Sequence, residues 1–413
     1  MKKVLVIGYV WPEPNSSAAG SHMMSILNLF KQQDWQVEFS TPSLPTDHMI
    51  DLSNEGISSK SIKLNCNSFD EYLLEYNPDI VLFDRFMMEE QFGWRVDKHC
   101  PNALKILDTE DLQCLRHGRH QACKADREMT QSDLLNDIAK REIAAILRCD
   151  ISLIISSYEM ELLNNTFNVD SNLLHHLPFM VDTENLPLAT KPYSEREHFI
   201  TIGNFRHAPN WDMVLYLQKI WPLIKNKLPE AELHIYGAYP PPKATALNNP
   251  KTGFLIKGWA EDVDSIMLES RVCLAPLRFG AGIKGKLIDA MRMQTPNITT
   301  TVGSEGMYIS EPWPGYINDN LQGFVDAAIN LYKNENIWLE AQSNAFNLLK
   351  SRYDSKILGS FLISRIIEIK NSLEQHRLNN FTGSMFKHHT MMSTKYMSQW
   401  ITAKNTLSDR EKN

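Results

Sequence analysis

The sequence predicts an α/β protein built from two doubly wound domains. The chain has 413 residues, which is longer than one hydrophobic core usually supports. Two successive series of short apolar segments alternate with segments of helical periodicity, a pattern typical of parallel sheets covered by helices on both faces. A proline-bearing stretch, 176–193, separates the two series.

The first series predicts the N-terminal domain. Short apolar or alternating runs indicate strands at 3–8, 35–40, 79–83, 104–108 and 152–156. Apolar residues that recur at helical spacing predict helices over 23–30 and 129–147.

The second series predicts a domain of similar size. Strands are expected at 199–203, 232–237, 254–257, 272–275 and 297–300, and helices at 211–225, 263–269, 284–293 and 321–332. A last periodic segment, 357–373, predicts a long helix, and the pattern then fades into polar sequence with scattered methionines. We therefore expect an N-terminal domain at 1–190, a C-terminal domain at 191–350, a helix at 351–378 that packs back on the N-terminal domain, and a mobile tail at 379–413.

Composition narrows the class of protein. The formal net charge of −7 argues against a general nucleic-acid binder. No apolar run approaches the roughly 20 residues of a membrane helix, and no signal peptide is recognisable. The six scattered cysteines are expected to be reduced, as in the cytoplasm. Lys387, Lys395 and Lys404 in the tail leave peripheral contact with the inner face of a membrane open, although no strong amphipathic stripe is evident.

Four possible metal ligands lie close together in the sequence, namely Cys114, His117, His120 and Cys123. Ligands spaced three residues apart on a helix wind around its surface and do not converge, so zinc is disfavoured there.

A glycine-rich turn with two lysines, 277–290, carries the strongest functional signal. Its three glycines let the backbone approach a ligand, and a helix start presents unpaired N–H groups with a partial positive charge. Lys284 and Lys286 add full charges, and Asp289, about one and a half turns into the helix, can accept hydrogen bonds from a sugar hydroxyl. The segment therefore predicts a site for a pyrophosphate flanked by a ribose. Packing alone also explains such turns, and neither common phosphate-binding glycine loop is present.

Paired doubly wound domains hold their ligands in the cleft between them, beyond the carboxyl ends of the strands. The glycine turn follows a predicted strand of the second domain, so we expect it to face this cleft.

Further segments accompany this turn, namely 178–182, 201–210, 233–237, 257–262, 275–278 and 300–306. Together they resemble the GT-B glycosyltransferases, most closely the retaining family 4 (group 1) enzymes that use nucleotide-activated sugars. The first half matches more weakly, at 8–20, 107–111 and 156–159.

The resemblance implies two facing Rossmann-like domains with an interdomain cleft. It also implies transfer of a sugar from a nucleotide-sugar to a hydroxyl of an acceptor glycan or lipid-linked saccharide, with retention, as in cell-envelope polysaccharide biosynthesis. Neither a metal nor another cofactor is expected, because lysines and a helix start take over the role of a metal.

By the same resemblance, Lys286 and Arg206 stabilise the departing diphosphate, and Glu110 and Asp111 orient hydroxyl groups. The donor would be held by residues spread over both domains: Gly20, Gly203, Asn204, Gly280, Ala281, Gly282, Ile283, Lys284, Asp289 and Glu305. The chain departs from the family at three positions. Asp289 replaces a glutamate, Ala281 an acidic residue and Gln113 a histidine.

Three other functions stay open. A nucleotide-sugar epimerase would share the architecture, and a catalytically inactive nucleotide-sugar-binding scaffold would fit the substitutions at Ala281 and Gln113. A nicotinamide-dependent oxidoreductase lacks the glycine spacing that it needs after the first strand. Ser156 and Glu159 are interpreted as a helix capping box. The base, sugar, acceptor and oligomeric state are not specified by the sequence.

Overall fold

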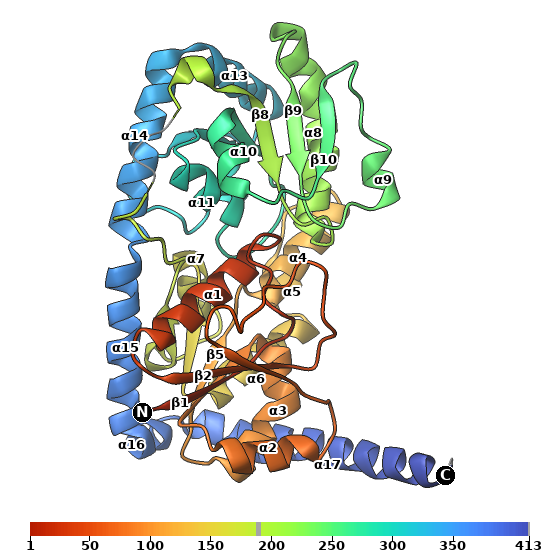
Figure 1. Ribbon diagram of the computed structural model, residues 1–413, viewed down its shortest axis with the longest axis vertical. Coiled ribbons are helices and arrows are strands. Elements are labelled where there is room, and N and C mark those ends of the chain that lie inside the picture. Colours follow the sequence, from red (N-terminus) through yellow and green to blue (C-terminus); the bar gives the residue numbers. More distant parts are fainter. Residues whose placement is uncertain (187–190, 412–413) are drawn as a thin grey trace.

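Two parallel sheets organise the chain (Figure 1). The computed structural model describes residues 1–186 and 191–411. The first sheet has seven strands in the order β3-β2-β1-β4-β5-β6-β7, and the second has six in the order β10-β9-β8-β11-β12-β13. All neighbouring strands pair in parallel. The predicted fold class is therefore confirmed.

The strands of the first sheet are β1 (Lys3–Ile7), β2 (Gln36–Thr41), β3 (Ser58–Ser61), β4 (Ile80–Asp84), β5 (Leu104–Asp108), β6 (Ile151–Ile154) and β7 (Leu174–His176). Those of the second are β8 (Glu197–Ile202), β9 (Leu233–Tyr236), β10 (Phe254–Gly258), β11 (Ser270–Ala275), β12 (Asn297–Thr299) and β13 (Gly315–Ile317). All ten predicted strands are present. The three that were missed, β3, β7 and β13, are short strands at sheet edges.

The helices of the first domain are α1 (Ala18–Lys31), α2 (Ser68–Tyr76), α3 (Phe86–His99), α4 (Gln113–Lys124), α5 (Gln131–Leu134), α6 (Asp137–Arg148) and α7 (Ser157–Asn165). Those of the second are α8 (Ala208–Lys227), α9 (Pro242–Thr245), α10 (Val263–Glu269), α11 (Gly285–Arg292), α12 (Thr301–Ser304), α13 (Leu321–Lys333) and α14 (Glu335–Arg352). The C-terminal helices are α15 (Ser355–Asn371), α16 (Leu373–Leu378) and α17 (Phe381–Glu411). Two short 3₁₀ turns lie at Ser171–Leu173 and Tyr193–Glu195.

The single helix predicted over 129–147 is wrong, because the segment is divided between α5 and α6. Asn136 has an extended backbone and accepts a hydrogen bond from the Ala139 N–H at 3.1 Å, so it caps α6 as a new helix. Its side-chain amide also donates to the carbonyl of Cys114 in α4. Hydrophobic periodicity runs across this break and does not reveal it.

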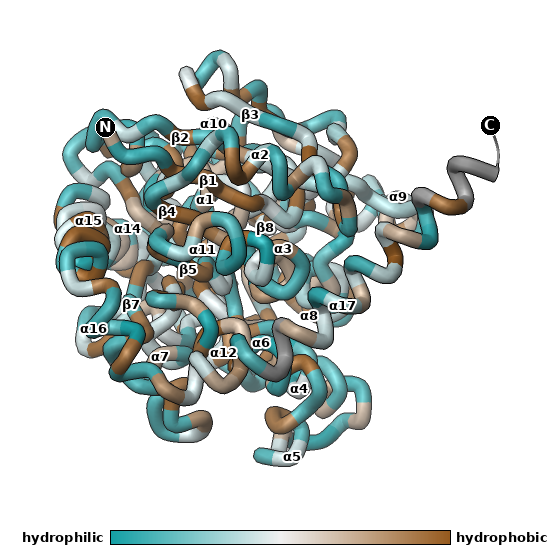
Figure 2. The backbone as a smooth tube through the Cα atoms, turned by 90° about the horizontal axis from the view of Figure 1, so that it is seen from below, coloured by the Kyte–Doolittle hydropathy of each residue, from teal (hydrophilic) through white to brown (hydrophobic). Residues whose placement is uncertain are grey.

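Both faces of the first sheet are covered. Along β1, Leu5 and Ile7 belong to one apolar cluster, while Val4 and Val6 belong to another on the opposite face. This alternation follows from the two-residue period of a strand, and a parallel sheet buries both sets. In Figure 2 the brown stretches near β1, β4 and β5 are surrounded by more hydrophilic helices and loops. The second sheet has a large apolar cluster of its own.

The chain crosses between the domains twice. It leaves the first domain after β7 and returns between α14 and α15, and the two crossings touch, because the N–H of Val181 donates to the carbonyl of Tyr353 at 2.7 Å. Trp338 of α14 lies in the core of the second domain, whereas Leu362 and Ile366 of α15 lie in that of the first. Helix α15 therefore packs on the first domain, where a C-terminal helix was expected to return.

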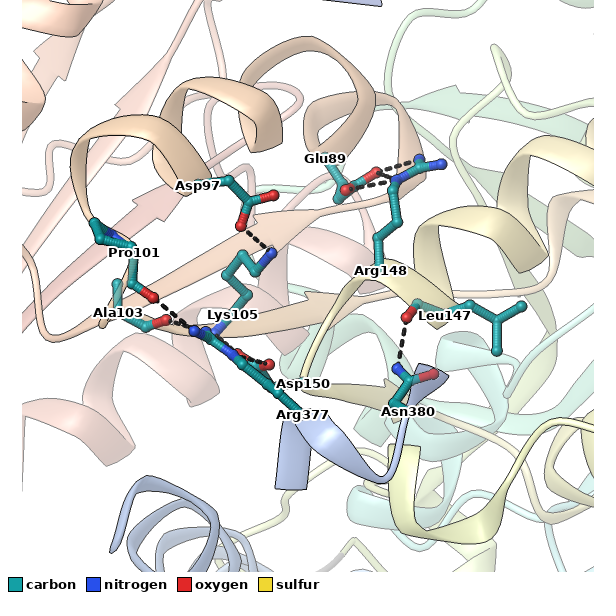
Figure 3. A network of polar contacts seen from close by, with 10 residues as sticks. All are labelled: Glu89, Asp97, Pro101, Ala103, Lys105, Leu147, Arg148, Asp150, Arg377 and Asn380. Atoms are coloured by element: carbon teal, nitrogen blue, oxygen red, sulfur yellow. Dashed lines mark hydrogen bonds and ion pairs between the residues drawn. The ribbon is translucent and has the colours of Figure 1, made fainter. Parts of the chain in front are cut away.

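A mobile tail was expected at 379–413, and its described part forms helix α17, which lies along α3 and α6 of the first domain. Figure 3 shows how this segment is anchored. Arg377 donates to both carboxylate oxygens of Asp150, at 2.8 Å each, and to the carbonyls of Pro101 and Ala103, while Asn380 donates to the carbonyl of Leu147. Such tertiary contacts leave no periodic signal in the tail. In the described part of the chain, no helix combines the length and apolarity needed to cross a bilayer.

A buried ion pair lies beside this anchor. Arg148 of α6 donates to Glu89 of α3 through Nε at 2.9 Å, and each side chain is 1% exposed. Removing one partner of such a pair leaves the other charge buried without compensation.

We therefore expect Glu89→Ala to lower the free energy of unfolding by about 3–5 kcal/mol. Urea denaturation followed by circular dichroism measures the change. Lys140→Ala removes an exposed ion pair with Asp137 and should change stability by less than about 1 kcal/mol. Equal effects of the two variants would contradict this account.

Candidate active site

A cavity of about 1080 Å³ lies between the two domains. Its walls come from the loops that follow β1, β4 and β5 in the first domain and β8, β9, β10 and β11 in the second. These are the carboxyl ends of both parallel sheets, where α/β folds place their ligands. All of the predicted site residues except Glu305 line this cavity.

The glycine turn after β11 is pressed against the first domain. Gly282 has φ of +62°, which favours glycine, and a Cβ there would lie 2.9 Å from Cβ of Asp111. Its N–H donates to Oε1 of Glu159 at 2.8 Å, so this group is already occupied by a carboxylate. Residues 281–283 were expected to hold the donor, and the backbone N–H of Gly282 among them already has a protein partner.

Lys284 holds the turn together. It is the N-cap of α11, and its Nζ donates to the carbonyls of Ala281, at 3.2 Å, and Gly282. The side chain is buried, and burial lowers the pKa of the amine to about 8. Direct contact with a diphosphate was expected for Lys284, but in this conformation its hydrogen bonds are made within the turn.

Lys286 lies in the first turn of α11 and lines the cavity. Its Nζ donates to Oδ1 of Asn210 in α8 at 2.7 Å, and burial lowers its pKa to about 8. A second-turn carboxylate, Asp289, also lines the cavity. Burial raises the pKa of Asp289 to about 6, against the opposing charge of Arg292 at 3.8 Å.

Arg206 brings a second cation to the cavity from the loop after β8. Its guanidinium lies 3.6 Å from the centre of the Tyr239 ring, and the Tyr239 hydroxyl donates to Glu13 of the first domain at 2.8 Å. Asn204 shapes this loop by accepting the N–H of Arg206 at 2.9 Å, and Gly203 lies where a Cβ would strike the side chain of Asn210. The loop thus holds Arg206 over a ring that is fixed across the cleft.

The first domain contributes carboxylates. Glu110, after β5, has φ of +60°, and Arg85, after β4, has φ of +68°. Two non-glycine residues in this strained region, on adjacent strand ends in a cleft, are typical of a functional site. Burial, followed by repulsion from Asp108, raises the pKa of Glu110 well above its usual value. Burial and the charge of Asp84 likewise raise the pKa of Asp108 to about 7.

Two further predicted residues have clear structural partners. Asp111 forms an ion pair with Arg116 of α4 at the cavity wall. Gly20, in α1, packs against the loop after β1, where a Cβ would lie 2.5 Å from the backbone of Glu13. Its lack of a side chain therefore lets this loop fold over α1.

Glu305 is a correction, since it does not belong to the cavity wall. Both of its oxygens accept hydrogen bonds from Arg119 of α4 at 2.7 Å, and Arg119 also donates to the carbonyl of Gly280 at 3.0 Å. Glu305 thus forms an interdomain ion pair outside the lining of the cavity.

The interpretation of Ser156 and Glu159 as a capping box is also wrong. Ser156 makes no side-chain cap, and Glu159 accepts the N–H groups of Leu112 and Gly282. Burial raises the pKa of Glu159 to about 8. The spacing of a capping box is thus present without its hydrogen bonds.

Sequence reasoning missed Arg85, Arg116, Asn210, Tyr239 and Trp259, all of which line the cavity. Trp259 donates across the cleft to the carbonyl of Asn15 at 3.2 Å. Arg85 and Tyr239 follow predicted strands within a few residues, so a search of strand ends would have found them. Asn210 and Arg116 lie on helices and carried no such signal.

Among the described residues, His198, Glu232 and His234 bring three possible metal ligands together, at the amino ends of β8 and β9. The N–H of Glu232 donates to Nδ1 of His198 at 3.3 Å, so the neutral ring carries its proton on Nε2, the nitrogen that faces the carboxylate. His234 Nε2 lies 2.8 Å from the same carboxylate. This is a hydrogen-bonded cluster, and its tautomer opposes metal binding. The four Cys and His residues of α4 form no such group in the described chain.

Comparison with known proteins identifies the fold. Residues 196–334 match the family of glycosyl transferases group 1. The structure of TarM from S. aureus, in complex with Fondaparinux, alpha-GlcNAc-glycerol and UDP, is similar with a TM-score of 0.69 and 12% identity over 90% of this chain and 100% of that one. The chain has the GT-B fold of glycosyltransferases. The resemblance seen in the sequence is thereby confirmed.

Two more GT-B structures are similar. Sucrose-phosphate synthase from Thermosynechococcus elongatus gives a TM-score of 0.68 at 14% identity, over 90% of this chain and 100% of that one. HepE from Anabaena, in complex with UDP and glucose, gives a TM-score of 0.66 at 9% identity, over 89% of this chain and 100% of that one. A curated relative, an uncharacterized 44.6 kDa protein in the cps region of Klebsiella pneumoniae, is 28% identical over 163 residues. That match spans 38% of this chain and 42% of the relative.

Burial of Lys284 and Lys286 predicts amines that titrate near pH 8, well below the usual lysine pKa. Reductive ¹³C-methylation followed by an NMR titration measures this. The half-buried Lys387 is expected in the same range, so Lys284→Gln and Lys286→Gln assign the signals by their loss. Ordinary lysine titration of both cleft amines would contradict the burial described here.

Proposed function

We propose that this protein is a glycosyltransferase that moves a sugar from a nucleotide-sugar to a hydroxyl of an acceptor glycan or lipid-linked saccharide, with retention. The observation that carries the proposal is the meeting of Lys286, Arg206 and the start of α11 in one interdomain cavity. The group 1 match covers this half of the chain, and the similar structures of TarM and HepE contain UDP.

The second domain binds the donor in this proposal. Negative charge grows on the diphosphate as the bond to the sugar breaks, and Lys286, Arg206 and the N-terminus of α11 stabilise it. Burial lowers the pKa of Lys286 to about 8, and a bound anion would raise it again by favouring the charged amine. Asp289, one turn further along α11, accepts hydrogen bonds from ribose hydroxyls.

The first domain orients the acceptor. Glu110 and Asp111 lie at the cavity wall opposite the glycine turn, where carboxylates accept hydrogen bonds from sugar hydroxyls. Contacts from both domains close the cleft and limit access of water, which favours transfer to a sugar over hydrolysis. The positive groups supply what a divalent metal would otherwise provide, so the proposed reaction needs neither metal nor cofactor.

A nucleotide-sugar-binding scaffold is the second candidate. It is favoured by Ala281, which packs among apolar residues of the first domain where the family resemblance implies an acidic residue. Diphosphate release from a panel of nucleotide-sugars, with analysis of the sugar product, separates the candidates. A glycosyltransferase releases the nucleoside diphosphate, an epimerase returns an altered nucleotide-sugar, and a scaffold does neither.

The proposal includes the setting of the reaction. We place the enzyme in the cytoplasm, at the inner face of the membrane when its acceptor is lipid-linked, in the synthesis of cell-envelope polysaccharide.

Lys286→Ala is expected to lower turnover by about 10²–10³-fold, because a preorganised charge beside the leaving diphosphate is lost. The assay is diphosphate release with the donor selected from the panel, and circular dichroism reports the fold. Lys140→Ala, which changes an exposed lysine of α6, should leave turnover unchanged. Near-wild-type transfer by Lys286→Ala removes the proposed role.

Metal independence is tested separately. Purified enzyme assayed with excess chelator should retain its turnover, because lysine, arginine and helix N–H groups carry the charge stabilisation. Loss of activity that returns with a divalent cation would show that this part of the proposal is wrong.

A further inference from the structure

Helix α17 turns its apolar side away from the protein. Six large apolar residues of α17 are 49–71% exposed, and all but Met397 lie on one side of the helix, which we call the outer stripe: Phe381, Met385, Tyr396, Trp400 and Leu407. At 100° per residue they fall within about 100° of arc around the helix. An amphipathic helix of a globular protein normally packs such a stripe on the core.

The opposite face of α17 packs on the first domain largely through small and polar residues. Gly383 would place a Cβ 2.1 Å from the carbonyl of Leu147. Ser398 is 4% exposed and accepts a hydrogen bond from Arg95, while Thr402 donates to the carbonyl of Asn65 at 2.6 Å. These contacts fix the rotation of the helix and leave the outer stripe facing solvent.

Anchors at the start of the segment hold the helix in this orientation. Arg377 and Asn380 bind backbone carbonyls and Asp150 of the first domain (Figure 3). From there α17 extends beyond the body of the protein, as Figures 1 and 2 show. The outer stripe therefore lies on the exposed side of a helix that extends from the protein, and no neighbouring element covers it in the described structure.

Between residues 375 and 408 every charged residue around the stripe is basic. No aspartate or glutamate occurs between Glu374 and Asp409, in a chain whose formal net charge is −7. Lys395 and Lys404 lie about 100° and 80° from the centre of the stripe, on its two flanks. Lysines in these positions can extend toward phosphate groups while aromatic and aliphatic side chains enter the acyl boundary.

We propose that the outer stripe of α17 binds the surface of an anionic lipid bilayer. Trp400 and Tyr396 insert at the headgroup level, where amphipathic aromatic rings are favoured, and the two lysines contact lipid phosphates. Apolar insertion and basic attraction together supply the two signals that stable peripheral binding needs.

The same stripe is poorly suited to a second copy of the chain. Pairing two α17 helices through it brings lysines to both sides of the contact, and no acidic residue between 375 and 408 is present to neutralise them. The bilayer site stands on the surface of α17 and does not rest on glycosyl transfer.

The test is co-sedimentation of the full chain with vesicles of phosphatidylcholine, with and without phosphatidylglycerol. Binding is expected to the anionic vesicles and to weaken with salt. A Tyr396→Ser, Trp400→Ser double variant should bind at least about tenfold more weakly, because its inserted surface is lost. Lys395→Gln with Lys404→Gln should reduce the preference for phosphatidylglycerol.

Leu44→Ser and Ile309→Ser are matched controls, since both residues are highly exposed and lie away from α17; they should bind like the wild type. Circular dichroism checks the fold of each variant, and the lipid and salt dependence of the wild type tests the proposal without any variant. Failure of the wild type to bind anionic vesicles, or undiminished binding by the aromatic variant, overturns it. A dimer in sedimentation velocity that is lost in Trp400→Ser assigns the stripe to a second copy and also overturns it.

Discussion

The geometry of the cleft depends on the contact between the side chain of Glu159 and the glycine turn. This side chain is fully buried between the two domains, where it accepts the N–H of Leu112 at the start of α4 and that of Gly282 in the glycine turn. Burial raises the pKa of this acidic group to about 8, and its Oε1 is stabilised by the two hydrogen bonds. The bond to Gly282 ties the glycine turn of the second domain to the first domain, and this turn leads directly into α11 and its lysine.

Both walls of the cavity carry charges of both signs, including Arg85 and Arg116 on the first domain and Asp289 on the second. Arg206 and Lys286 come from the second domain, whereas Asp84, Glu110 and Asp111 come from the first. Raised pKa values at Glu110 and lowered values at Lys286 have the same cause, which is burial before a ligand is bound. Phosphate groups of a donor would interact with the buried amine of Lys286, and sugar hydroxyls would hydrogen-bond to the buried carboxyl group of Glu110.

Much of the fold could be predicted from the sequence, because its cause is local. The ten strands predicted from apolar runs include every central strand of both sheets, since strands buried on both faces must be apolar. The missed strands β3 and β13 are short, and the four residues of β3 are polar and exposed, so they carry no such pattern. Likewise, the division between α5 and α6 depends on the side chain of Asn136, which a hydrophobic period does not register.

The candidate site was predictable where function follows a strand end and less so where it depends on contacts between domains. Lys286 was found through the glycine turn that follows a strand and Glu110 through the family resemblance, and both line the cavity. Glu305 and Glu159 were misassigned because their partners lie 186 and 123 residues away along the chain. The outer stripe of α17 was missed for a related reason. Only the packing of Ser398 and Gly383 shows which side of the helix faces outward.

The double crossing of the chain has a consequence for how the lobes can move. Because the two passages are hydrogen-bonded to each other at Val181, Tyr353 and Ser355, any opening of the molecule must swing about that seam. Sliding of the two domains past each other, or independent rotation of the domains, would break these hydrogen bonds. A single cut by a protease in either passage should accordingly leave the halves attached, and only a second cut would release them.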